Sequence, residues 1–519
     1  MSTITQFINN KFGGIRRKES CFAEEKITCS DCQNVELFFT DLNSGIGIRT
    51  AKGNQSIPIS LPQGEKLIEG FESQQDGETQ IFLYAESSTE GKIYAYNQTL
   101  STITTVVTGL TVTGKACGVD YAQGVLDMFV FSNGSEVKYI YSNTDTHTKL
   151  VVESNENIHL VDGIGRTVKG LGVKVFDGRV WIFNERNLWY SQQGECRNFV
   201  PSGNDYTTDA GYIETVKNIT AIYVYLGSLA VFHSDSSALI TIDATTKFAL
   251  GDESPGGCAS YNSLVFHGTD LYFYDNTKKG VFSFQQVVNG DKTLGDNIAL
   301  DIQEELVKIQ DYDVDKIKAI SVVTSDRNEV WFITPLSDDS NHSIVMIFDY
   351  LRFEWVKRKC QKINSAVIFS GNLYSLGEKL YQEYTTDLFD GEFIKSYYNC
   401  SIFTLGSDNT LKITKMPPRI TIDGNYKCDF WVKYVKNYQT YKTPKIKRIK
   451  SKQLSNVLIY DTGMHYDSCF IYVPNTVNAI VKLPSATFKA LEISFYTDLQ
   501  NQEFCIKAFE FSRLKIKQV

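Results

Sequence analysis

The first residues suited to chemistry are two cysteines near the N-terminus. Cys29 and Cys32 are separated by two residues, and Cys21 precedes them. Two thiolates at this spacing can hold one tetrahedral zinc ion. A complete site needs two further ligands, but no second Cys-x-x-Cys and no paired histidines follow in the sequence. We therefore predict no metal site.

Other motifs are equally incomplete. Asp311, Asp313 and Asp315 alternate as in a calcium loop, but the glycine and the terminal glutamate of such a loop are missing, so we interpret the tract as a solvated loop. The glycines at 163 and 165 match too little of a dinucleotide fingerprint. The histidines stand apart from any nucleophile motif, and we expect them to be structural; they are His147, His159, His233, His267, His342 and His465. The sequence predicts no catalytic residue and no cofactor.

One charged segment stands out. Residues 433–452 carry eight basic side chains and no acidic one, in a chain whose net charge is −8. The candidate interface residues within it are Lys442, Lys445, Lys447, Arg448, Lys450 and Lys452. One interpretation is a solvated sheet edge whose lysines prevent pairing with other edges. The other is a surface that docks against an acidic face of a neighbouring subunit.

The elements that would position these residues are short β-strands. Residues 173–199 describe a whole hairpin, because Asp177-Gly178 is a strong tight-turn pair and the apolar segments VWIFN and NLWYS follow it. The VWIFN pattern recurs about every 49 residues. Its seven copies begin at Ile81, Met128, Val180, Leu229, Leu271, Val330 and Leu373, and each is followed by another strand.

Four short strands per 40 to 50 residues are typical of a propeller blade. We predict an all-β chain with a β-propeller of about seven blades over residues 65–384, interrupted by a short helix over residues 299–307. Residues 1–64 form an N-terminal arm and hairpin. The hairpin, residues 35–50, is an eighth blade or the strand that closes the ring. Residues 385–519 form a separate C-terminal, β-sandwich-like domain.

Composition limits the function. With 519 residues and 13% aromatic side chains, the chain can bury large cores. Its acidic balance argues against a wholly basic nucleic-acid binder. We expect no secretory signal and no membrane-spanning segment, because the longest apolar run, residues 219–232, is shorter than the roughly 20 residues that cross a bilayer. The eleven cysteines are then expected to be thiols in a cytoplasm.

The order of the blades resembles the tail nozzle, or tail accessory, proteins of short-tailed bacteriophages. The segments that carry the resemblance are residues 187–199, ending in Asn-Phe, SLAVFHSDS at residues 228–236, and IFDYLRFEW at residues 347–355. The resemblance covers roughly residues 160–384 and is one of layout. A related ring position, that of the muzzle-type tail protein of crAss-like phages, is an alternative within it.

The resemblance implies a structural virion protein without enzymatic activity. Such a subunit forms an oligomeric ring, typically a hexamer, in the tail below portal and adaptor, contacts tail fibres or spikes, and conducts DNA during ejection. It is assembled in the bacterial host cytoplasm. A conduit gains little from holding phosphate, so for the basic segment we favour docking over DNA contact.

Two other classes of function remain open. One is a carbohydrate-binding or carbohydrate-acting propeller, with some of the 29 tyrosines as sugar platforms, although most tyrosines are expected to pack between blades. The other is a cytoplasmic propeller scaffold, although the Gly-His and Trp-Asp pairs of one such family and the double glycines of another do not recur here. Association with purified particles distinguishes all three classes.

Overall fold

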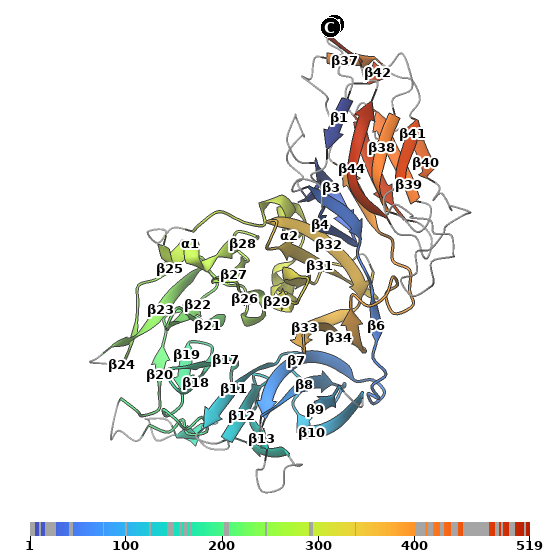
Figure 1. The fold of residues 1–519 in the computed structure, drawn as a ribbon. Coiled ribbons are helices and arrows are strands. Elements are labelled where there is room, and N and C mark those ends of the chain that lie inside the picture. Colours follow the sequence, from blue (N-terminus) through green and yellow to red (C-terminus); the bar gives the residue numbers. More distant parts are fainter. Residues whose placement is uncertain are drawn as a thin grey trace, which may run out of the picture. The chain divides into compact units, whose positions relative to one another are not determined.

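A computed structural model gives the fold, and it is nearly all β (Figure 1). It describes residues 6–9, 12–15, 27–40, 45–75, 77–98, 101–123, 126–142, 150–154, 158–159, 165–166, 168–201, 207–243, 247–289, 294–337, 339–400, 410–413, 419–425, 430–436, 445–449, 477–482, 487–488, 491–497, 504–512 and 515–518. The chain forms two compact units. Unit 1 comprises Met1–Gly53, Arg352–Lys359 and Tyr384–Val519, and unit 2 comprises Asn54–Leu351 and Cys360–Glu383. The all-β prediction is confirmed.

Seven small antiparallel sheets follow one another through unit 2. The first two are β7 (Lys66–Gln75), β8 (Glu78–Glu86), β9 (Gly91–Asn97) and β10 (Thr102–Leu110), then β11 (Cys117–Gln123), β12 (Leu126–Ser132), β13 (Val137–Ser142) and β14 (Leu150–Ser154). The third is β17 (Leu171–Phe176), β18 (Arg179–Asn184), β19 (Asn187–Tyr190) and β20 (Gly211–Glu214), preceded by the small pair β15 (Ile158–His159) and β16 (Gly165–Arg166).

The remaining sheets continue the series. The fourth is β21 (Ala221–Tyr225), β22 (Ser228–Phe232), β23 (Ser236–Asp243) and β24 (Lys247–Leu250), with β25 (Ser254–Pro255) beside β23; the fifth is β26 (Leu264–His267), β27 (Asp270–Asp275) and β28 (Gly280–Ser283). The sixth is β29 (Lys318–Val323), β30 (Asn328–Thr334), β31 (His342–Asp349) and β32 (Glu354–Gln361), and the seventh is β33 (Ile363–Phe369), β34 (Asn372–Gly377), β35 (Leu380–Glu383) and β6 (Asn54–Ser56).

The seven sheets close into a ring (Figure 1). The first strands of neighbouring sheets contact one another directly, from β7 to β11, β17 and β21 and from β26 to β29 and β33, and β33 contacts β7 again. Apolar clusters fill the spaces between the first five sheets and between the seventh and the first. A middle strand such as β18 or β27 is buried along nearly its whole length because sheets cover both of its faces. Every one of the seven predicted VWIFN-type segments is the second strand of its sheet. The β-propeller itself stays a prediction.

The non-β segments are short. They are η1 (Tyr261–Ser263), α1 (Phe284–Asn289), η2 (Leu300–Ile302), α2 (Gln303–Leu306) and η3 (Asp311–Lys316). The helix expected over residues 299–307 is present as η2 and α2. The acidic tract after it is a 3₁₀ helix and not a loop, because Asp311 pairs with Lys279 at 2.7 Å and Asp313 with Lys316 at 2.6 Å. No helix in the described ranges is long and apolar enough to cross a membrane.

The ring is closed by a strand that the sequence analysis did not identify. We expected residues 35–50 to be an eighth blade or the closing strand, but this hairpin, β4 (Val35–Phe39) and β5 (Ile46–Thr50), pairs with β44 (Cys505–Ser512) in unit 1. The closing strand is β6, whose three residues pair with β35. Apolar alternation marks β4 and β5, whereas β6 is polar and carries no such signal.

Unit 1 draws its strands from both ends of the chain. One sheet has the order β4-β5-β44-β38-β41, with β1 (Gln6–Asn9) beside β44; the other has the order β2-β3-β36-β43-β39-β40. The further strands are β2 (Phe12–Ile15), β3 (Ile27–Gln33), β36 (Tyr397–Cys400), β38 (Arg419–Asn425), β39 (Phe430–Lys436), β40 (Lys445–Ile449), β41 (Val477–Lys482) and β43 (Leu491–Tyr496), and a third sheet joins β37 (Thr410–Ile413), β42 (Thr487–Phe488) and β45 (Lys515–Gln518).

This arrangement corrects the predicted domain boundaries. Residues 1–64 are not a separate arm, because β3 pairs with β36 and β5 pairs with β44, so the N-terminal strands complete the sheets of the C-terminal domain. The boundary near residue 384 agrees with the start of Tyr384–Val519 in unit 1. The segment Arg352–Lys359 also belongs to unit 1, although it lies within the repeats along the sequence.

The closing strand gives a first prediction. Asn54 is fully buried and its Nδ2 donates to Glu383 Oε1 at 2.8 Å, so Asn54→Ala removes a donor from a buried carboxylate. We expect the free energy of unfolding of the ring to fall by about 2 kcal/mol. The matched control is Gln55→Ala on the same strand, where the side chain is exposed and the change should stay within about 0.5 kcal/mol. Equal effects of the two substitutions in urea unfolding would contradict the closing role of Asn54.

Candidate subunit interface

The segment Arg352–Lys359 is anchored firmly in unit 1. The Glu354 carboxylate accepts a hydrogen bond from the Gly14 amide at 2.8 Å, and the Lys357 ammonium lies 2.8 Å from Asp31 Oδ1. A Cβ atom at Gly14 would lie 2.4 Å from the carbonyl oxygen of Trp355, so only glycine permits this close approach. These contacts fix the beginning of β32 within unit 1.

The turn between β31 and β32 presents apolar side chains to solvent. Phe353 is 68% exposed and has a left-handed backbone, with φ of 54°, and Leu351 is 55% exposed. In unit 1, the Arg352 guanidinium lies 4.2 Å from the ring centre of Phe39, which is itself 56% exposed. We call Phe39, Arg352 and Phe353 the aromatic tip. Large exposed aromatic side chains beside an arginine are typical of protein interfaces.

Tyr350 and Leu351 precede the two tip residues of that turn in the sequence and belong to unit 2. The ring of Tyr350 makes an edge-on contact with His267 at 4.8 Å, and its backbone amide donates to Asn328 O at 3.1 Å. The amide of Leu351 donates to Asp349 Oδ1 at 3.1 Å, and Asp349 is buried. The sequence IFDYLRFEW therefore encodes an anchored turn with an inward tyrosine.

The predicted basic segment falls on β40. This strand ends the six-strand order of its sheet and pairs with β39, with Lys445 opposite Tyr434, Lys447 opposite Val432 and Arg448 opposite Trp431. Lys442, Lys450 and Lys452 lie outside the described residues. The terminal place of β40 fits both interpretations of the segment, edge protection and docking, so docking stays a prediction.

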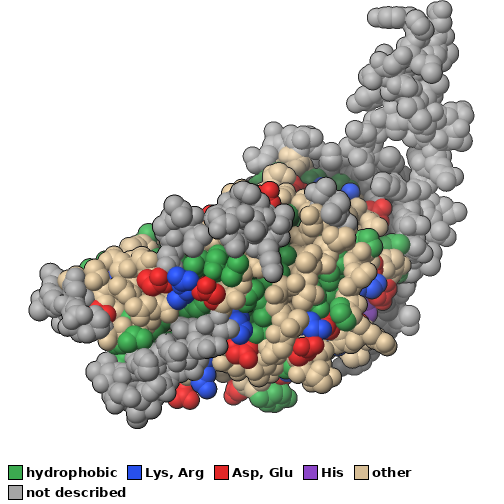
Figure 2. Space-filling model, turned by 90° about the horizontal axis from the view of Figure 1, so that it is seen from below, with side chains coloured by type: hydrophobic (Ala, Val, Ile, Leu, Met, Phe, Trp, Pro, Cys, Tyr) green, Lys and Arg blue, Asp and Glu red, His purple; other side chains and the backbone are tan. Residues whose placement is uncertain are grey.

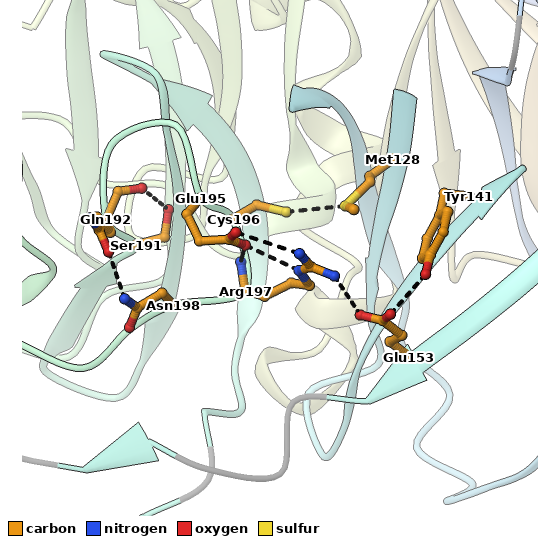
Figure 3. Close-up of polar contacts among 9 residues, drawn as sticks. All are labelled: Met128, Tyr141, Glu153, Ser191, Gln192, Glu195, Cys196, Arg197 and Asn198. Carbon is orange, nitrogen blue, oxygen red and sulfur yellow. Dashed lines mark hydrogen bonds and ion pairs between the residues drawn. The ribbon is translucent and has the colours of Figure 1, made fainter. Parts of the chain in front are cut away.

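The segment ending in Asn-Phe clasps two sheets of the ring (Figure 3). It follows β19, and Asn198 Nδ2 donates to Gln192 Oε1 at 2.6 Å, which shapes the loop. Arg197 binds Glu195 of its own loop at 3.0 Å and reaches Glu153 on β14 at 2.7 Å. The core below is apolar, with Cys196 Sγ 3.5 Å from Met128 Sδ on β12. The clasp, residues 191–199, thus joins the third sheet to the second.

Hydrogen bonding sets the charge states in the clasp. The hydrogen bond from Tyr141 lowers the pKa of Glu153 most, followed by that from Arg197, and the same Tyr141 bond, at 2.7 Å, raises the pKa of the tyrosine. Glu195 and Glu153 raise the pKa of Arg197. Burial raises the pKa of Cys196 to about 12, so this thiol stays protonated. The cluster is therefore an ion-pair network that ties two sheets together.

The inner strands of the ring carry further polar contacts that the sequence analysis missed. Lys318 of β29 contacts Glu69 of β7, and the Ser365 hydroxyl of β33 donates to the same carboxylate. Burial lowers the pKa of Lys318 to about 7, whereas the contact with Glu69 favours the charged form. Three sheets meet at this carboxylate. No local motif signals such a group, because the three residues are far apart in the sequence.

A second inner group is aromatic. The Lys174 ammonium of β17 lies 4.4 Å from the ring centre of Tyr223 on β21, and Tyr223 stacks on Phe266 of β26 at 6.2 Å. The stacked rings of Tyr223 and Phe266 have the kind of arrangement on which a sugar ring can pack. Other tyrosines, such as Tyr84, Tyr139 and Tyr374, are fully buried between strands, in agreement with the expected packing role.

Two of the isolated histidines sit at strand ends in structural settings. His233 Nδ1 lies 3.0 Å from Asn218 O, and His267 Nδ1 lies 2.9 Å from Ser321 Oγ. Both side chains are buried, and burial lowers the pKa of His267. These contacts hold neighbouring chain segments together.

The two N-terminal cysteines lie in the core of unit 1. Cys29 and Cys32 are fully buried on β3, and Cys400 on β36 stands opposite Cys29. Cys21 lies outside the described residues. Within the described part of the chain, no group of three His, Cys, Asp or Glu side chains could hold a metal ion.

The visible surface has no single dominant charge. On the face in Figure 2, acidic and basic side chains form small mixed groups with apolar side chains between them. Such a surface provides no broad field that would attract nucleic acid.

Comparisons with known proteins give little guidance. No family model and no curated protein matches the sequence. Among solved structures, a functionally unknown protein from Desulfotomaculum acetoxidans DSM 771 is similar, with a TM-score of 0.31 and 8% sequence identity over 53% of this chain and 81% of that chain. A likeness this weak says nothing about function.

The clasp gives a second prediction. Arg197→Ala should lower the free energy of unfolding by about 1 kcal/mol at pH 7, because the side chains of Arg197 and Glu153 are more than a third exposed and solvent screens the pair. The lowered pKa of Glu153 makes this stabilisation present above the unfolded carboxyl pKa of about 4.3 and lost as the pH falls through the folded value.

The measurement is urea unfolding of wild type and variant at pH 7 and pH 3, and the difference should be smaller at pH 3 than at pH 7. The control is Arg186→Ala, which breaks a more exposed pair with Glu214 and should cost less than about 0.5 kcal/mol. A pH-independent loss in Arg197→Ala would mean that the charge pair is not its cause.

Proposed function

We propose that the protein is a structural subunit of a bacteriophage tail, which assembles with copies of itself into a nozzle ring that conducts DNA. The aromatic tip carries this proposal. Phe353 and Arg352 lie in the IFDYLRFEW segment, one of the three that resemble the nozzle proteins, and Phe353 is 68% exposed. A subunit interface would bury the exposed part of this aromatic ring.

The charges of the chain support a second copy as the partner. The molecule is acidic overall, at −8, while β40 brings Lys445, Lys447 and Arg448 to one end of a sheet. The basic strand of one copy can then meet acidic side chains of its neighbour. Unlike surfaces that meet head to tail generate closed rings when the rotation closes. Opposite charge then orients the encounter, and the apolar contacts hold it.

The clasp and the ion pair between Lys318 and Glu69 fit this role. Both join separate sheets, so a mechanical load on one sheet passes to its neighbours. A tail subunit needs such stiffness. Hexamer symmetry, a place below portal and adaptor, and contact with fibres or spikes come with the resemblance alone.

One alternative has an observation in its favour. The stacked Tyr223 and Phe266 on the inner strands could form a platform for a sugar ring, as in a carbohydrate-binding propeller. Binding of oligosaccharides that Tyr223→Ala abolishes, by a protein absent from particles, would favour that function. A scaffold in the cytoplasm would show neither sugar binding nor particle association.

The aromatic tip gives a third prediction. Phe353→Ser should weaken self-assembly by about 2 kcal/mol per contact, which raises the concentration for half-assembly roughly 30-fold. Sedimentation velocity over a concentration series measures this, and circular dichroism should show an unchanged fold.

The control is Leu226→Ser, which removes an apolar side chain that is 77% exposed on the turn after β21. It should leave assembly within twofold of wild type. The interface assignment fails if Phe353→Ser assembles like wild type, or if both variants are equally impaired.

The basic segment gives a fourth prediction. Replacing Lys445, Lys447, Arg448 and Lys450 with Ser should weaken ring or tail assembly most strongly at low salt, because added salt already screens the charges in the wild type. The isolated subunit should remain folded. If the variant assembles like wild type at both low and high salt, the docking role is wrong and edge protection takes its place.

A further inference from the structure

Three cysteine thiols meet in the core of unit 1. Cys29 and Cys32 lie on β3, Cys400 lies on β36, and all three side chains are fully buried. The Cys29 thiol hydrogen-bonds to the Cys32 sulfur, and Cys400 is near enough to influence the charge of Cys29. The proposed interface does not use this group.

A bulge in β3 brings the thiols together. In a regular strand, residues three apart point to opposite faces, so Cys29 and Cys32 would be separated by the sheet. The register between β3 and β36 shifts between Cys29 and Asp31, which adds one residue and returns Cys32 to the face of Cys29. Cys32 is paired with Tyr398, and Tyr398 is two residues before Cys400, so all four side chains share one face.

Backbone geometry determines which two of the three cysteines can form a disulfide. Cys29 and Cys400 are direct partners in an antiparallel ladder, where Cα atoms lie about 4.5 to 5.5 Å apart and side chains point the same way. A disulfide needs a Cα separation of about 4.4 to 6.8 Å. Cys29 and Cys32 are three residues apart on one strand, and in an extended strand such residues have Cα atoms about 10 Å apart, beyond the reach of a disulfide.

We propose that Cys29 and Cys400 are a latent crosslink that closes on oxidation into an intramolecular disulfide between the two ends of unit 1. With oxidised glutathione as the oxidant, one thiol loses its proton and attacks the glutathione disulfide, which releases one reduced glutathione. The second thiolate then attacks the mixed disulfide and releases the other. Two cysteine thiols are oxidised and one glutathione disulfide is reduced.

The burial of the pair controls when this happens. Burial raises the pKa of Cys29, and the neighbouring thiol Cys32 raises it further, so the folded protein holds few thiolates. The thiols react when β3 opens from β36, as during folding or partial unfolding. The bond then closes a loop of about 370 residues. A chain made in a reducing cytoplasm would form this disulfide only after exposure to an oxidant.

The test is disulfide mapping of the full chain after equilibration with oxidised and reduced glutathione at pH 8, with and without urea below the unfolding midpoint. Peptide mass spectrometry without reduction should find Cys29 joined to Cys400, and urea should speed its formation. The oxidised protein should unfold at a urea concentration higher by about 1 M, and dithiothreitol should reverse this.

Three variants assign the effect. Cys29→Ala and Cys400→Ala should abolish the shift in midpoint, whereas Cys32→Ala should keep both the crosslinked peptide and the shift. The mapping uses the wild-type chain, so it does not depend on the variants folding. A Cys29–Cys32 or Cys32–Cys400 disulfide, or free thiols at Cys29 and Cys400 after oxidation in urea, would overturn the proposal.

Discussion

Closure of the ring by β6 is the interaction on which the rest of unit 2 depends. Each sheet of three to five strands has two apolar faces, and neither is buried until a neighbour packs against it. The first and seventh sheets share a core that contains Ile81 and Leu83 of β8 and Tyr374 and Leu376 of β34. This core forms only when the two ends of the series meet. Pairing of β6 with β35 ties the start of the series to its end.

Closure of the ring also brings together polar groups from different sheets. The Glu69 carboxylate pairs with Lys318 and accepts a hydrogen bond from Ser365, which lie on two other sheets. The clasp at Arg197 joins the second and third sheets. A buried ion pair such as that of Glu69 and Lys318 contributes less to stability than to a unique arrangement. Together with the clasp, it links particular sheets to one another.

The sequence predicted the elements that a local pattern of residues determines. All seven second strands follow from apolar alternation with a turn before each, because burial on both faces selects β-branched and aromatic residues. It did not predict partners far apart in the chain. The polar β6 has no pattern, and nothing near residues 27–50 indicates pairing with β36 and β44. The aromatic tip and the Cys29–Cys400 pair were missed for the same reason, since each depends on where the fold brings residues together.

The central claim, that the chain is a ring-forming tail subunit, is tested most directly by the mass and symmetry of the purified full-length protein. Native mass spectrometry and electron microscopy of the same sample measure both. We predict that the purified protein forms a closed ring with one fixed number of copies, most simply six. The same number should be found in purified particles. A monomer at every concentration, with no such protein in particles, would contradict it.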